Sequence, residues 1–187
     1  MLLQFTPEQK AQEIDWQIIY NQNRSCPIIP RFKRIFQIGL FIVEVCFRFI
    51  VFKSFYKKNK RLYLKRQGNW LRKKLLTMGA AFIKAGQFMS LRPDIIEDEI
   101  CQELDELQDK VPPFSPKLAK EIIENELQSQ GKTFQECFSY FGEEPIAAAS
   151  MGQVHRAKLK KSGEEVVIKV QRPKVFEIIK LDIMIFR

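Results

Sequence analysis

Histidine and paired cysteines are scarce in this sequence of 187 residues. There is one histidine, and the four cysteines lie far apart without a Cys-x-x-Cys pair. Structural zinc sites are built from closely spaced cysteine and histidine ligands, so we expect no metal centre of that kind. Nothing in the spacing requires disulfides, which indicates a reducing compartment.

The N-terminus lacks a charged start followed by an apolar run, and we therefore expect no secretory signal peptide. Apolar residues make up 45% of the chain and charged residues 28%, a globular composition that excludes a disordered or collagen-like protein. Residues 1–80 hold 16 Lys and Arg against 4 Asp and Glu, a net charge of +12. Residues 81–187 hold 15 against 18, a net charge of −3, so a polyanionic partner is expected for the first part alone.

Residues 35–55 form the longest apolar stretch, but polar side chains interrupt it. At 3.6 residues per turn Arg34, Gln37, Glu44 and Arg48 share one stripe, and Glu44 can pair with Arg48. A central charge costs a spanning helix about 2.5–3.5 kcal/mol, which disfavours a membrane span. Two alternatives stay open: a helix in the membrane interface beside anionic headgroups, or a buried helix whose polar stripe faces solvent. Nucleic acid is not expected as a partner, because the basic region has no recognisable docking module.

Helical periodicity and capping patterns predict helices next, followed by strands. The expected helices cover residues 8–23, 61–91 with a break near Gly79, 94–107 opened by Asp94 with Glu97, 115–130 opened by Ser115 with Pro116, and 133–140 opened by Thr133 with Glu136. Residues 154–159 and 165–170 alternate like strands and are joined by turn residues 161–164, and residues 175–186 return to a helical period. Helices followed by strands indicate an α+β fold.

The strand pair carries a pattern typical of nucleotide-binding kinases. A G-x-G-x-x-G-x-V loop is followed there by V-A-I-K; here Ala147 and Ala149 replace the first two glycines, Gly152 and Val154 match, and Lys169 ends the second motif. Glycines in such loops admit positive φ and let N–H groups approach phosphates. The lysine would bind the α- and β-phosphates, and the valine would pack against adenine. A lysine on a strand can equally be an ordinary solvated residue, with Val166, Ile168 and Val170 on the opposite, buried face. We expect His155 to face solvent.

A second motif lies in the helix after Gly79. Lys84 and Gln87 are three residues apart and share a face that is ordinarily solvated. Gly86 between them costs about 1 kcal/mol relative to alanine, which indicates a reason such as close helix contact. Spacing alone leaves the role of this face open.

Four motifs in order carry a resemblance to a known family. They are K-x-G-Q at residues 84–87, L-Q-D at 107–109 with Pro112-Pro113, the alanine-rich stretch 147–154, and V-I-K-V-Q-R-P at 167–173. From about Gly68 onward the chain resembles the UbiB/ADCK family of atypical protein-kinase-like proteins. The resemblance implies a kinase-like fold whose helical extension, carrying K-x-G-Q, lies over the substrate position. Lys84 and Gln87 would then gate the active site.

The resemblance also implies the ligands and the setting. ATP or ADP with Mg²⁺ would bind at Ala147, Ala148, Ala149, Ser150, Gly152, Val154 and the catalytic Lys169. Family members associate peripherally with membranes and support prenyl-lipid, including isoprenoid-quinone, metabolism. An anionic membrane surface or a prenyl lipid is therefore an expected partner, in a bacterial, plastid or mitochondrial setting.

The expected architecture has three parts: a basic and apolar segment over 1–60, a helical extension over 61–140, and a partial kinase-like N-lobe over 141–187, truncated before the C-lobe. No catalytic Asp, Asn or metal ligand of a kinase can be assigned, and we expect the last strands and helix to lack a packed partner. The main hypothesis is an ATP-binding atypical kinase or ATPase-like protein. The alternative is a non-catalytic membrane-surface or lipid-binding helical module.

Overall fold

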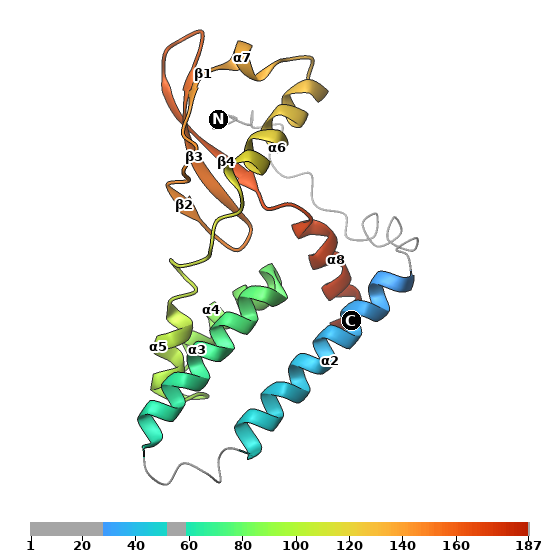
Figure 1. Cartoon of the computed structure of the whole chain (residues 1–187), viewed down its shortest axis with the longest axis vertical. Coiled ribbons are helices and arrows are strands. Elements are labelled where there is room, and N and C mark those ends of the chain that lie inside the picture. The colour runs from blue at the N-terminus through green and yellow to red at the C-terminus, as the bar shows by residue number, and fades with distance from the viewer. Residues whose placement is uncertain (1–27, 52–58, 187) are drawn as a thin grey trace. The chain divides into compact units, whose positions relative to one another are not determined.

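The computed structural model describes residues 28–51 and 59–186 (Figure 1). The helix expected at residues 8–23 lies outside them. Within the described residues the chain forms seven helices and one antiparallel four-stranded sheet, which confirms the α+β class. The elements are α2 (Ile28–Val51), α3 (Lys60–Met78), α4 (Ala80–Ser90), α5 (Asp98–Asp105), α6 (Pro116–Ser129), α7 (Phe134–Cys137), β1 (Phe138–Phe141), β2 (Ala147–Ala148), β3 (Gly152–Leu159), β4 (Glu165–Gln171) and α8 (Val175–Phe186).

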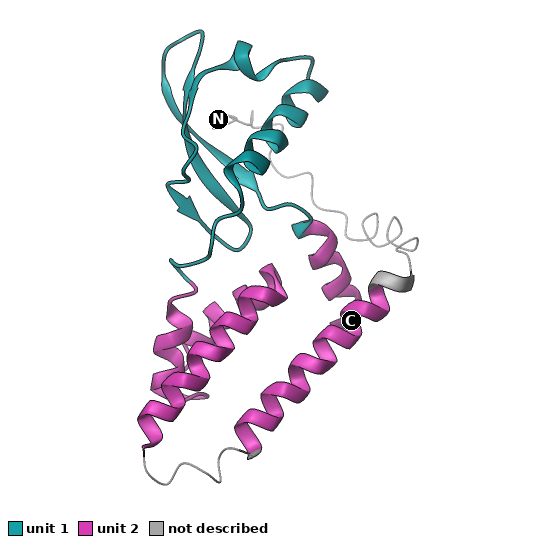
Figure 2. Ribbon diagram, in the orientation of Figure 1, with its two compact units in different colours: residues 1–4, 108–175 teal, residues 5–107, 176–187 magenta. Residues whose placement is uncertain are grey.

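The chain divides into two compact units, coloured separately in Figure 2. Among the described residues, unit 1 comprises residues 108–175 and holds the sheet with α6 and α7. Unit 2 comprises residues 28–51, 59–107 and 176–186 and is entirely helical. Each unit has its own buried apolar residues.

In unit 1 the sheet is organised around β3. The strands β1 and β2 pair with β3 along one edge, and β4 pairs with it along the other, all antiparallel. One face of the sheet packs on α6 and forms the core. The buried residues of that core are Ala119, Ile123 and Leu127 from α6 and Phe138, Ala157, Ile168 and Val170 from the strands.

In unit 2 the helices α3, α4 and α5 pack closely. The predicted break falls at Gly79, whose φ of 98° lies in the region that favours glycine. Gly86 of α4 is the expected point of close helix contact: a Cβ there would lie 2.7 Å from the Leu75 side chain and 2.6 Å from that of Leu107. The glycine in K-x-G-Q is thus required by packing.

The helix α2 turns its polar stripe toward the rest of unit 2. Glu44 pairs with Arg48 at 3.9 Å, as expected, and also with Lys74 of α3 at 2.5 Å. The Arg48 guanidinium lies 4.3 Å from the ring centre of Trp70. The apolar side is exposed, with Phe36 at 68%. The alternative of a buried helix with a solvent-facing polar stripe is therefore wrong, because the polar stripe has its partners inside the unit.

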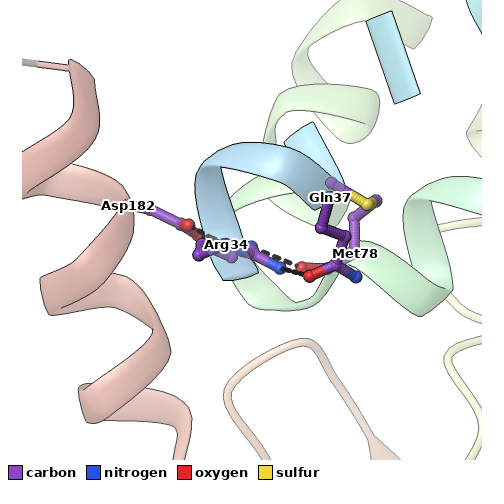
Figure 3. A network of polar contacts seen from close by, with 4 residues as sticks. All are labelled: Arg34, Gln37, Met78 and Asp182. Carbon is purple, nitrogen blue, oxygen red and sulfur yellow. Dashed lines mark hydrogen bonds and ion pairs between the residues drawn. The ribbon is translucent and has the colours of Figure 1, made fainter. Parts of the chain in front are cut away.

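Arg34 is the clearest example of a polar residue of α2 that faces the rest of unit 2 (Figure 3). Its Nε donates to Asp182 Oδ1 at 2.6 Å and its Nη2 to Asp182 Oδ2 at 2.8 Å, which joins α2 to α8. Nη2 also donates to the Met78 carbonyl at 2.7 Å, and Nη1 donates to Gln37 Oε1 at 2.9 Å. Arg34 and Asp182 are both buried. No helix in the described ranges is both long and apolar enough to cross a membrane.

Of two capping boxes predicted at helix starts, one is confirmed and one is wrong. The capping box of Thr133 with Glu136 is present in both of its hydrogen bonds. Asp94 instead accepts two hydrogen bonds from the Arg92 side chain, and α5 begins after Glu97 with no side-chain cap. The predicted capping box at Asp94 is therefore wrong, since the arginine two residues earlier binds its carboxylate.

The C-terminal elements also differ from two expectations. The short helix expected to reach Tyr140 ends at Cys137, and Phe138–Phe141 form β1 instead, because Phe138 enters the α6 core. The last strand and helix are packed rather than partnerless. Val170 of β4 is 3% exposed in the α6 core, and Asp182 of α8 is held by Arg34.

Candidate functional site

Three of the predicted nucleotide-site residues lie side by side across the sheet. Ala147 of β2 is the register partner of Val154 of β3, and Val154 is the register partner of Lys169 of β4. Directly opposite residues in antiparallel strands point to the same face. We call Ala147, Val154 and Lys169 the loop row.

The loop row lies on the face of the sheet opposite the α6 core. Ile168 and Val170 are buried, whereas Lys169 between them is exposed, so the predicted alternation along β4 is confirmed. Val167, on the Lys169 face, is 45% exposed. This face thus combines the apolar surface of Val154 and Val167 with the exposed cationic side chains of Lys169, Arg156 and Lys158, a chemistry suited to a flat apolar ring attached to an anion.

The alanine-rich stretch makes a tight turn at one end of the loop row. The N–H of Ala149 donates to the Gly152 carbonyl at 2.7 Å, and the N–H of Ile146 donates to the Val154 carbonyl at 2.8 Å. The Ser150 residue at the tip is buried. Ala148 pairs with Gln153 and so lies on the core side of the sheet rather than in the loop row.

Gly152 has a different physical role from the one expected. It is not among the described glycines with positive φ, which are Gly79, Gly131 and Gly163. A Cβ at Gly152 would collide with the Val170 carbonyl oxygen of β4. Glycine is therefore needed here for the close approach of two strands, not for a left-handed backbone.

His155 does not face solvent, and that expectation is wrong. Its ring is fully buried, stacks on Phe141 with centroids 4.8 Å apart, and uses Nδ1 to bond the Gly142 carbonyl at 2.8 Å. Its Nε2 lies 2.9 Å from the Gln153 amide nitrogen. The register would have revealed this, because His155 pairs with the buried Ile168.

Gln153 and Arg172 fix the segment before α6 and were missed by sequence reasoning. The Gln153 side chain accepts from the Phe114 N–H at 2.9 Å and donates to the Phe114 carbonyl at 3.2 Å. Arg172 Nη2 donates to the carbonyls of Pro112 at 2.9 Å and Ala149 at 3.2 Å. Burial lowers the pKa of the Arg172 guanidinium. No local pattern reports contacts across 39 and 60 residues of sequence.

Lys84 and Gln87 lie on α4 in unit 2. Lys84 is exposed and donates to Gln87 Oε1 at 3.1 Å. Gln87 Nε2 donates to the Leu107 carbonyl at 2.8 Å, which joins the K-x-G-Q motif to the L-Q-D motif. The expected gating of the nucleotide loop by these two residues stays a prediction.

The carboxylates of the described residues form no cluster of the kind that holds a metal. No group of three or more His, Cys, Asp or Glu with suitable geometry occurs in residues 28–51 and 59–186. The expectation that this chain supplies no metal ligand stays a prediction.

Comparison with known proteins gives consistent matches. The family described as the ABC1 atypical kinase-like domain matches residues 106–187. Protein ACTIVITY OF BC1 COMPLEX KINASE 8, chloroplastic, of Arabidopsis thaliana is 44% identical over 158 residues, which cover 81% of this chain and 20% of that protein. A probable protein kinase UbiB of Pseudomonas aeruginosa is 49% identical over 124 residues, 66% of this chain and 22% of that protein.

The family model covers the L-Q-D, alanine-rich and V-I-K-V-Q-R-P motifs. The chain spans about a fifth of the length of the curated relatives it matches. The residues that carry the loop row fall within the matched domain. On these grounds the chain belongs to the UbiB/ABC1 family of atypical kinase-like proteins.

Proposed function

We propose that this chain supplies the nucleotide loop and the phosphate-binding lysine of an ATP-binding atypical kinase or ATPase-like protein of prenyl-lipid metabolism. The loop row carries the proposal, because it sets Lys169 beside Val154 and Ala147 on an open sheet face. Membership of a kinase-like family and a relative named UbiB support it.

In this proposal each part of the loop row has a chemical role. The Lys169 ammonium binds phosphate oxygens by charge-assisted hydrogen bonds. Val154 and Val167 offer apolar surface to the adenine ring. The turn from Ala147 to Gly152 covers the phosphates, and Mg²⁺ bound with the nucleotide would neutralise further phosphate charge. Lys84 and Gln87 would control access to the site.

Titration of the full-length protein that carries this chain with a fluorescent ATP analogue tests the proposal. A charge-assisted hydrogen bond contributes about 1.5–3 kcal/mol, so Lys169→Ala should weaken binding by about 10- to 150-fold. Lys158→Ala is the matched control, because Lys158 is an exposed lysine of the same sheet and lies outside the loop row. Equal affinity of the wild type and Lys169→Ala would refute the proposal.

A second function is favoured by α2. We infer that the exposed apolar side of α2 binds an anionic membrane surface peripherally, since Phe32, Phe36 and Ile50 are exposed at 68%, 68% and 72%. Basic residues in the neighbouring sequence would contact headgroups. This function is compatible with nucleotide binding and is tested by flotation with anionic phospholipid vesicles.

A further inference from the structure

Arg172 holds two backbone carbonyls of the alanine turn. Its Nη2 donates to the Ala149 carbonyl at 3.2 Å, and its backbone N–H donates to the Met151 carbonyl at 2.9 Å. These carbonyls flank Ser150 at the tip of the turn. One residue outside the turn therefore fixes the direction of two of its peptide groups.

The guanidinium of Arg172 is itself held in place by other groups of unit 1. Nη2 also donates to the Pro112 carbonyl at 2.9 Å, and the guanidinium lies 5.5 Å from the ring centre of Phe114. Both backbone groups of Phe114 are bound by the buried Gln153 side chain. Arg172 forms no ion pair with a carboxylate in the part of the chain described, so carbonyl dipoles and an aromatic face are what surround its charge.

The direction of the carbonyls determines the direction of the neighbouring N–H groups. In a trans peptide the C=O and the following N–H point in opposite directions, and no peptide bond of the described residues is cis. Because the Ala149 carbonyl points to Arg172, the Ser150 N–H points away from it. Phosphate oxygens accept from backbone N–H groups, whereas a carbonyl turned toward them would repel them.

We propose that Arg172 is a positioning residue for the nucleotide phosphates: it holds the Ala149 and Met151 carbonyls, which would repel phosphate oxygens if they turned toward them. The inference rests on the proposed nucleotide function. It also explains how a turn built of alanines obtains a fixed peptide orientation without the conformational freedom of glycine.

The test compares two ligands in the full-length protein: ATP, which has phosphates, and adenosine, which has none. Loss of one oriented phosphate contact should lower the ATP affinity of Arg172→Ala by about tenfold, while adenosine affinity stays within about twofold of the wild type. Arg172→Lys keeps the charge and a donor and should recover part of the ATP affinity. Arg66→Ala, which removes an exposed arginine of α3, is the control and should change neither affinity.

Measuring ATP affinity at low and high salt distinguishes a positioning role of Arg172 from a long-range electrostatic effect of its charge. The ratio of ATP affinities between wild type and Arg172→Ala should persist in high salt, which screens charges at a distance but leaves the direct hydrogen bonds from Arg172 to the turn in place. A ratio that disappears in salt overturns the inference. So does equal ATP affinity of the two proteins, or an equal loss of ATP and adenosine binding, which would indicate a collapsed site.

The inference and the proposed function fail in different ways. If the wild type binds no ATP, the proposed function is wrong and the inference falls with it. If the wild type binds ATP and Lys169→Ala lowers the ATP affinity, but Arg172→Ala leaves the ATP affinity unchanged, only the proposed role of Arg172 is wrong.

Discussion

The strand β4 and the helix α2 are both amphipathic, yet β4 buries only apolar side chains, whereas α2 buries the charged Arg34 beside Ile38 and leaves large apolar side chains exposed. In unit 1, β4 buries Ile168 and Val170 against α6 and leaves Lys169 exposed. In unit 2, α2 buries Arg34 and leaves Phe36 exposed. A periodic sequence pattern defines two faces, and the partner decides which of them is buried.

The partners of the two elements explain the difference. The α6 helix presents Ala119, Ile123 and Leu127 to the sheet, so apolar residues of β4 are removed from water. The partners of α2 at Arg34 are the Asp182 carboxylate and the Met78 carbonyl. A buried guanidinium is acceptable there because both its charge and its donors are matched.

The largest expected effect comes from removing one half of the buried ion pair. Asp182→Ala leaves the Arg34 guanidinium buried without its carboxylate, which typically costs about 3–5 kcal/mol of stability. Replacing both partners by apolar residues, with Arg34→Met and Asp182→Leu, should restore most of the loss. Urea unfolding of the wild type, of Asp182→Ala and of the double variant measures the loss of stability and its recovery. A single variant as stable as the wild type would show that α2 and α8 are not joined by this pair.

The exposed side of α2 gives the next effect. An apolar side chain transferred from water to a lipid interface contributes up to about 1.5–3 kcal/mol, so Phe36→Asp should lower binding to anionic phospholipid vesicles by about tenfold or more. Leu62→Asp is the matched control, because Leu62 is an exposed apolar residue of α3. Flotation in a sucrose gradient measures the bound fraction. Equal loss from both variants would contradict a specific role for α2.

The third comparison is between two glycines: Gly152, where two strands approach closely, and Gly39, on the open surface of α2. Gly152→Ala forces a Cβ against the Val170 carbonyl and should cost about 1–3 kcal/mol. Gly39→Ala on α2 meets no atom within 4 Å and should stabilise the helix by about 0.5–1 kcal/mol. Thermal unfolding of both variants measures the contrast. A Gly152→Ala protein as stable as the wild type, or a Gly39→Ala protein less stable than the wild type, would require a different backbone at that position.

The smallest effect concerns the capping box before α7. Hydrogen bonds from Thr133, first its backbone N–H, lower the pKa of Glu136 below its ordinary value. A carboxylate with a lowered folded pKa stabilises the fold above its unfolded pKa, and this stability is lost as the pH falls through the folded pKa. Glu136→Gln should therefore flatten the acid side of the stability profile slightly. Urea midpoints between pH 3 and 7 measure it, and an unchanged profile would contradict the cap's contribution.

Local patterns predicted the elements well and the long-range contacts poorly. The break at Gly79, the Thr133 cap, the strand alternation around Lys169 and the close helix contact at Gly86 follow from neighbours in sequence. The strand β1 was missed, because its burial against α6 depends on a distant helix.

The candidate site shows the same limit. The loop row could be predicted because a kinase-like motif and a hairpin place its residues in register. The anchoring roles of Gln153 and Arg172 could not, since their partners lie 39 and 60 residues away. The burial of Arg34 on α2 could not be predicted either, because its partner Asp182 lies 148 residues away in the sequence.

Amide hydrogen exchange of the full-length protein with and without Mg-ATP tests the nucleotide site most directly. ATP should slow exchange in residues 147–154 and 165–171, and Lys169→Ala should remove that protection at the same nucleotide concentration. Bound ATP that leaves both segments unchanged while it protects another part of the protein would contradict the account.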